Sequence, residues 1–159
     1  MNPSLGPGSG GTDSDIDYVQ WAINIANDDR YYYDHSSSPW TFSCSTFVAS
    51  ALYRTGHLPN DICPPSGAAI GGEGGSTLHN ALRSAGFQEL SAGQVGGFEG
   101  LQPGDIFTIG PSYHVAIYAG NGQAVSANGP DPSSPDFDQA ASITTYDVHM
   151  GELRTVFRK

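Results

Sequence analysis

The most informative stretch for the fold is YHVAIYAGNGQAVSAN, residues 113–128. Residues 113–119 and 123–127 are short β-like runs on either side of the Gly-Asn-Gly triplet, which is typical of two antiparallel strands joined by a tight turn. A three-residue turn made of this triplet would pair Ala119 with Gln123. Counting back along both strands then sets His114 opposite Asn128. Side chains directly opposite each other lie about 5 Å apart at Cβ, so we expect Asn128 to reach the His114 imidazole.

The first strand of this hairpin has two unlike faces, because successive side chains of a strand point to opposite sides. His114 shares its face with Ala116 and Tyr118, whereas Val115 and Ile117 lie on the other face. The alanine next to the histidine is small. We therefore expect the His114 face to leave room for the end of a helix.

Helices are predicted before this hairpin and short strands around it. Apolar residues at helical spacing predict three helices, over residues 15–27, 44–55 and 77–85. Short β-like runs bounded by turn residues follow at 87–90, 105–109, 113–119, 123–127, 142–146 and 154–158. This order predicts an α+β domain, with N-terminal helices packed on one face of an antiparallel sheet of about five or six strands.

Length and charge narrow the classes of protein that remain. The chain of 159 residues suits one domain, which we place at 15–159 after a flexible Gly/Ser/Pro linker at 1–14. The linker resembles no secretion signal, and no apolar stretch is long enough to cross a membrane. The net charge of −10 argues against a nucleic-acid partner and against tight non-specific binding to anionic surfaces. We expect the isolated domain to be a monomer.

Cys44 begins a predicted helix, and this position suits a nucleophile. The helix dipole and the unpaired backbone N–H groups of the first turn favour the thiolate, and the same N–H groups can bind an oxyanion. Polar Ser43 and Ser45 flank the cysteine, so we expect the thiol at the exposed tip of an otherwise buried helix. The alternative from this segment alone is a small buried apolar residue at a helix start.

His114 is the candidate base for this nucleophile. Asn128, or Ser126 on the same face two residues nearer the turn, would fix the tautomer and the angle of its ring. A histidine on a strand can equally be structural, and this alternative stays open for His114 taken by itself.

The other cysteine and the other histidines show no comparable setting. Cys63 lies in a proline-rich loop, and we expect both cysteines to be free thiols. We interpret the remaining histidines as surface or core residues: His35, His57, His79 and His149. Their spacing fits no metal site, and we expect neither a metal nor another cofactor.

Three segments occur in order along the chain: SCSTFV at 43–48, LQPGDIF at 101–107, and HVAIY at 114–118, followed by GNG. Together they resemble the NlpC-type papain-like peptidoglycan hydrolases, which include phage endolysin catalytic domains, and more distantly the CHAP amidases. The corresponding patterns in that family are D-C-S-x-F/L-V, L-x-P-G-D and H-V-G-I-Y…G-N-G. The likeness runs from about residue 31 to the end.

The resemblance implies a papain-like fold and hydrolysis of an amide bond of bacterial peptidoglycan. The enzyme would be an endopeptidase or an N-acetylmuramoyl-L-alanine amidase, with a thioester on Cys44 and His114 as base. A tyrosine about twelve residues before the cysteine assists the oxyanion in this family, which indicates Tyr32, within the run 31–33. Tyr32 and Ser45 are thus the candidates for stabilising the oxyanion and positioning the substrate.

For the third catalytic residue the resemblance leaves two candidates, Ser126 and Asn128. Motif spacing puts it at Ser126, whereas a polar pair on this strand in CHAP-like relatives and the hairpin count both favour Asn128. The chain also departs from the family at Ser43, in place of aspartate, and at Ala116, in place of glycine. The family's common Tyr-Trp-Gly-Gly pattern is absent.

The expected setting is the bacterial cell wall, outside the cytoplasmic membrane, where the domain would act as part of a phage lysin. Because the domain is acidic, we expect other domains or subunits to supply wall binding. Two alternatives remain from the sequence: an amidase toxin used between bacteria, and a catalytically inactive wall-binding module of a virion. The inactive module remains an alternative because serine, at position 126, is a poor residue for orienting the histidine ring.

Overall fold

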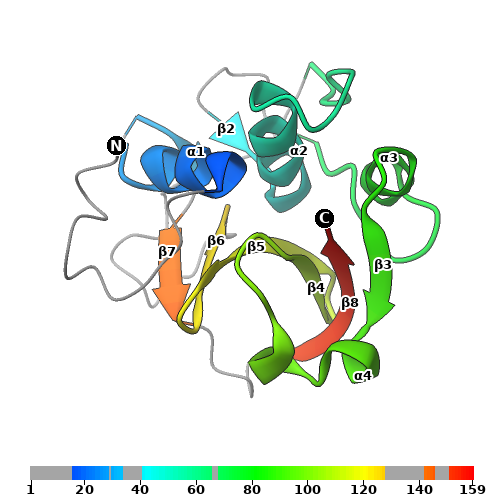
Figure 1. Cartoon of the computed structure of the whole chain (residues 1–159). Coiled ribbons are helices and arrows are strands. Elements are labelled where there is room, and N and C mark those ends of the chain that lie inside the picture. The colour runs from blue at the N-terminus through cyan, green and yellow to red at the C-terminus, as the bar shows by residue number, and fades with distance from the viewer. Residues whose placement is uncertain (1–15, 29, 34–40, 66–67, 128–141, 146–150) are drawn as a thin grey trace.

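The computed structural model describes residues 16–28, 30–33, 41–65, 68–127, 142–145 and 151–159. The predicted linker over residues 1–14 lies outside the described residues. Within them the chain has the predicted α+β organisation, in which helices pack against one antiparallel sheet (Figure 1).

The three predicted helices are confirmed. They are α1 (Asp17–Ala26), α2 (Cys44–Arg54) and α3 (Thr77–Ser84). Their apolar residues recur at helical spacing, so that one face of each helix is buried. On α2 this face consists of Phe47, Val48, Ala51 and Leu52. Two short elements are additional, the helical turn α4 (Ala92–Val95) and the 3₁₀ turn η2 (Phe98–Gly100).

Among the described residues the main sheet has six strands in the order β3-β8-β4-β5-β6-β7, and all neighbours are antiparallel. The strands are β3 (Gln88–Ser91), β4 (Ile106–Gly110), β5 (His114–Gly120), β6 (Gln123–Ser126), β7 (Ser142–Thr145) and β8 (Glu152–Arg158). Strands β4 to β7 form the predicted meander. The last strand, β8, inserts between β3 and β4, and this long-range pairing has no local sequence signal.

The turn between β5 and β6 is shorter than predicted. Gly120 pairs with Gln123, so the turn has two residues, Asn121 and Gly122, in place of the predicted three. Both have positive φ angles, 52° and 73°. A two-residue turn with two positive φ angles matches the right-handed twist of the strands, and Asn-Gly is the pair that adopts it most readily.

The predicted register is nevertheless recovered beyond the turn. The pairing shifts by one residue between Tyr118 and Gly120, after which Tyr118 pairs with Ala124 and Ile117 with Val125. An irregularity of this kind takes up one extra residue on one strand. The described pairing follows the predicted register as far as Ile117 and Val125. Asn128 itself lies outside the described residues.

The two faces of the sheet are covered by different elements. Helices α1, α2 and α3 pack on the face that carries Val115, Ile117 and Val125. The other face carries Ala116 and Ala124 and is covered by α4 and η2 (Figure 1). The prediction that a helix end approaches beside Ala116 is therefore wrong. The larger Val115 and Ile117 side chains offer more apolar surface, and α2 buries that face instead.

The Pro-Gly-Asp segment, residues 103–105, connects the start of β4 to the last strand through hydrogen bonds. The Asp105 carboxylate, which is 1% exposed, accepts hydrogen bonds from the Gln102 amide at 2.8 Å and from Arg158 Nε and Nη2 at 2.9 and 2.8 Å. The Tyr18 hydroxyl donates to the Gly104 carbonyl at 2.7 Å. The motif thus ties α1 and β8 to the strand that pairs with β5.

Candidate active site

Helix α2 begins at Cys44 because Ser43 caps it. The Ser43 hydroxyl accepts a hydrogen bond from the Thr46 amide at 3.2 Å, and the Thr46 hydroxyl accepts one from the Ser43 amide at 2.8 Å. This reciprocal pair satisfies two of the backbone donors at the helix start. Ser43, where the motif that the chain resembles has aspartate, therefore preserves the helix start and the position of Cys44 in its first turn.

The Cys44 thiol lies against three backbone amides. Those of Val115, Ser45 and Cys44 itself face the sulfur and each lowers its pKa. Burial of the thiol is the larger effect, however, and the pKa of Cys44 is raised above its ordinary value. The resting thiol is therefore protonated at neutral pH. The amides of the helix start favour the thiolate, as expected, but burial of the thiol outweighs them.

The tip of α2 is also less exposed than predicted. Ser43 and Ser45 are 1% and 0% exposed, although both are polar. The reason is a loop that packs over the first turn, where the Ser45 hydroxyl accepts a hydrogen bond from the Ile70 amide at 2.8 Å. The Ser45 side chain thus fixes the loop, while its backbone amide faces the thiol.

His114 is the first residue of β5, directly before the residue whose amide faces the Cys44 sulfur. Its side chain is half-buried, and its Nε2 atom is enclosed by protein. The fold therefore brings the backbone of the predicted base beside the predicted nucleophile, although the two are far apart in the sequence.

The remaining predicted site residues are placed less completely. Ser126 is buried at the end of β6, and the register of the hairpin puts it diagonal to His114 rather than opposite. Asn128, the preferred third member, lies outside the described residues. Of Tyr32 only the backbone is described. It pairs with Thr41 in a parallel two-residue ladder, β1 (Tyr32–Tyr33) with β2 (Thr41–Phe42), in a segment predicted to be a loop.

Two residues that were not predicted for the site are Tyr113, which lies near Cys44, and His79, which contacts Tyr113. His79 Nε2 is 2.9 Å from the Tyr113 hydroxyl, and the His79 ring packs edge-on against Phe157 with centroids 4.9 Å apart. Burial is the largest cause that raises the pKa of the Tyr113 hydroxyl, followed by the nearness of Cys44 and Glu73. The signal for Tyr113 was its position directly before His114. His79 carried no signal beyond its place between the apolar residues of α3.

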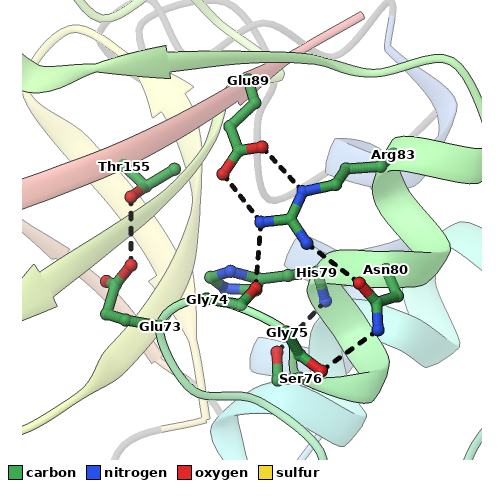
Figure 2. A network of polar contacts seen from close by, with 9 residues as sticks. All are labelled: Glu73, Gly74, Gly75, Ser76, His79, Asn80, Arg83, Glu89 and Thr155. Carbon is green, nitrogen blue, oxygen red and sulfur yellow. Dashed lines mark hydrogen bonds and ion pairs between the residues drawn. The ribbon is translucent and has the colours of Figure 1, made fainter.

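A glycine-rich loop, Gly71–Gly75, forms one rim of the site and is fastened to the sheet through Glu73. The Thr108 hydroxyl donates to Glu73 Oε1 at 2.5 Å, and the Thr155 hydroxyl donates to Oε2 at 3.0 Å. These two threonines lie on β4 and β8, so a single carboxylate connects the loop to two neighbouring strands. Figure 2 shows the bond between Glu73 and Thr155.

The same loop is fastened on its other side to α3 (Figure 2). Arg83 Nη2 donates to the Gly74 carbonyl at 2.9 Å, and Asn80 donates to the Gly75 carbonyl at 3.1 Å. Arg83 also forms a two-pronged ion pair with Glu89 at 2.7 and 2.8 Å. Side-chain bonds to backbone carbonyls give this irregular segment partners that a helix or strand would otherwise supply. The rim is therefore a fixed part of the site.

The tightest point of this rim is Gly71. A Cβ atom at this position would lie 2.7 Å from the Tyr113 hydroxyl oxygen and 3.0 Å from Ser45 Cβ. We expect Gly71→Ala to push the loop away from Cys44, to destabilise the domain by about 1–3 kcal/mol and to lower hydrolysis. Gly75→Ala is the matched control, because nothing lies within 4 Å of its Cβ position. Thermal unfolding of both variants tests this, and equal stability would contradict it.

The stability of the domain should depend on pH through His79. Burial lowers the pKa of His79, so the folded protein holds this ring neutral while the unfolded chain protonates it near pH 6.5. The stabilisation is present above that pH and is lost as the pH falls further. Denaturant unfolding at pH 7.5 and at pH 5.0 should show a larger loss for the wild type than for His79→Gln. Identical losses would refute this assignment.

Other classes of site find little support in the described residues. No group of three His, Cys, Asp or Glu side chains in the described ranges is placed to hold a metal ion. Cys44 and Cys63 are both free, as predicted. None of the helices that the structure describes has the length and apolar character needed to cross a bilayer.

Comparison with known proteins gives no family assignment. A scan against models of protein families finds no match, and a search of curated proteins finds no significant one. The function is therefore inferred from the site itself and from the three motif segments.

Proposed function

We propose that this chain is a cysteine-dependent amide hydrolase in which Cys44 is the nucleophile and His114 the base. One observation carries the proposal: the thiol at the start of α2 lies against the amide of Val115, directly after His114. Two motif segments that are distant in the sequence thus meet at one point. Strict alternation would place the His114 side chain on the Ala116 face, whereas α2 covers the Val115 face. The proposal therefore requires the imidazole, on the first residue of β5, to turn toward the Cys44 side, where a base must lie to activate the thiol.

The raised pKa of Cys44 defines the role of the base. Because the resting thiol keeps its proton, His114 takes that proton as the sulfur attacks the carbonyl carbon. The carbonyl oxygen becomes an oxyanion, which the amides of Cys44 and Ser45 can stabilise. His114 then gives the proton to the leaving amine, and a thioester remains on Cys44. Water, deprotonated by His114, hydrolyses the thioester and restores the thiol.

The resemblance at 43–48, 101–107 and 114–118 supports peptidoglycan as the substrate and a papain-like NlpC-type fold. In this proposal the domain acts on the bacterial wall outside the cytoplasmic membrane, as the catalytic part of a phage lysin. The acidic surface, with a net charge of −10, favours wall binding by other domains or subunits. The bond is either a stem-peptide bond or the muramoyl–alanine amide.

The products of wall digestion test the proposal. Purified peptidoglycan incubated with the protein should lose turbidity and release free amino groups without new reducing sugar ends, because an amide and not a glycosidic bond is cut. Mass spectrometry of the muropeptides then identifies the bond. Release of reducing ends alone, or of neither group, would rule the proposed reaction out.

A catalytically inactive wall-binding module is the alternative that one observation favours. The Cys44 thiol is held protonated by burial, as expected of a structural cysteine. Cosedimentation with purified walls distinguishes the two. An inactive module stays bound to the walls and releases no amino groups. The enzyme releases amino groups, and because it digests the wall, less protein sediments with time.

A further inference from the structure

The Tyr113 hydroxyl occupies a defined position at the first turn of α2. The empty Cβ position of Gly71 lies 2.7 Å from this hydroxyl oxygen and 3.0 Å from Ser45 Cβ, so both atoms border the same small space. Tyr113 directly precedes His114, and its ring is half-buried and packs against the core that surrounds α2. The hydroxyl is therefore held beside the residues proposed to carry the reaction.

The direction of the Tyr113 hydrogen follows from the tautomer of His79. The His79 side chain is fully buried, and its Nδ1 atom has no hydrogen-bond partner among the described residues. A proton on Nδ1 would be a buried donor without an acceptor, which is costly. Burial also lowers the pKa of His79, so the ring is neutral and carries one proton. That proton is assigned to Nε2, which donates to the Tyr113 oxygen at 2.9 Å.

A tyrosine oxygen that accepts from His79 keeps its own hydrogen for another acceptor. The backbone amide of Gly72 also faces this oxygen. Because both of these groups donate to the oxygen, the Tyr113 hydrogen is left for a third group, and the neighbouring first turn of α2 holds Cys44. Burial, followed by the charges of Cys44 and Glu73, raises the pKa of Tyr113 above its ordinary range, so the hydroxyl remains a donor in alkaline solution.

We propose that the Tyr113 hydroxyl donates a hydrogen bond to the substrate carbonyl oxygen, and to the oxyanion formed from it, with His79 as the positioning residue that aims the hydroxyl. This inference rests on the proposed function. When the Cys44 sulfur bonds to the carbonyl carbon, the π electron pair moves to the oxygen, and the hydrogen bond from Tyr113 strengthens. The tyrosine keeps its proton throughout. This is the role that the resemblance assigned to Tyr32.

The test uses the full chain in a Cys63→Ala background, so that Cys44 is the one remaining thiol in the sequence. Alkylation by iodoacetamide at pH 8.5 counts the folded sites, and wall hydrolysis is expressed per alkylatable Cys44. We expect Tyr113→Phe to lower kcat about 100-fold, with KM unchanged within about twofold, because the lost interaction forms only in the transition state. The alkylation rate should stay the same.

His79 is tested by two variants that differ in their hydrogen-bonding groups. His79→Gln can still donate an N–H to Tyr113, and we expect its kcat to fall less than about tenfold, whereas His79→Leu should fall as far as Tyr113→Phe. A Tyr113→Phe variant with undiminished kcat would overturn the inference, and so would equal losses in both His79 variants. If Cys44→Ala is fully active, the proposed function itself fails. If Cys44→Ala is inactive while Tyr113→Phe is fully active, only this inference fails.

Discussion

Replacing Cys44 by alanine should abolish the release of amino groups from purified walls, with a loss on the order of 10⁴-fold or more. No thioester can form without the sulfur, and alanine cannot replace the thiol as nucleophile. The fold should be preserved, because Ser43 and Thr46 cap α2 independently of the residue at position 44. Circular dichroism and thermal unfolding verify that the variant is folded.

Cys63→Ala is the matched control for this variant. Cys63 is also a free, partly buried thiol with a raised pKa, but its sulfur contacts the Ser50 hydroxyl at 3.4 Å, further along α2. We expect this variant to keep full activity. Full activity of Cys44→Ala, or loss in both variants alike, would contradict the assigned nucleophile.

Replacing His114 by alanine should lower kcat about 1000-fold at neutral pH, because the buried thiol then has no base to remove its proton. The rate of this variant should also depend on pH. The pKa of Cys44 is raised, so without a base the rate follows the small thiolate fraction and rises about tenfold per pH unit until the thiol titrates. Rates of wall hydrolysis between pH 6 and pH 9 measure this slope.

His57→Ala is a suitable control for the histidine variant. His57 Nε2 lies 2.7 Å from Asp17 Oδ1, and the pair belongs to the α1 side of the molecule rather than to the site. Its rate should be that of the wild type at each pH. A His114→Ala variant that loses no activity at pH 7 would show that another group activates the thiol.

The sequence predicted those parts of the fold that depend on local chemistry. Helix α2 follows from apolar residues at helical spacing after Ser43, and the β5–β6 hairpin follows from alternation around Asn121-Gly122. The turn length was wrong while the register beyond it was right. Asn-Gly strongly prefers a two-residue turn, which shifts the pairing of the two strands by one residue. The irregularity near Tyr118 shifts it back by one residue, so the two changes cancel.

The site could be predicted only in part, because much of it is made by contacts between distant segments. The pairing of β8 with β4, the loop that covers Ser45, and the bond between His79 and Tyr113 all join residues far apart in sequence. Burial of the Cys44 thiol is a consequence of these contacts. The sequence could show the helix terminus, which lowers the pKa of Cys44, but not the burial, which raises it by more.

The most direct test of Cys44 as the nucleophile is mass spectrometry of the protein after acid quenching of a reaction with soluble muropeptides. Acid protonates the base and preserves a thioester. We predict an adduct with the mass of the acyl product on the tryptic peptide that contains Cys44, and its loss when the reaction runs to completion. Turnover with no adduct on that peptide, or with the adduct on Cys63, would contradict a thioester mechanism at Cys44.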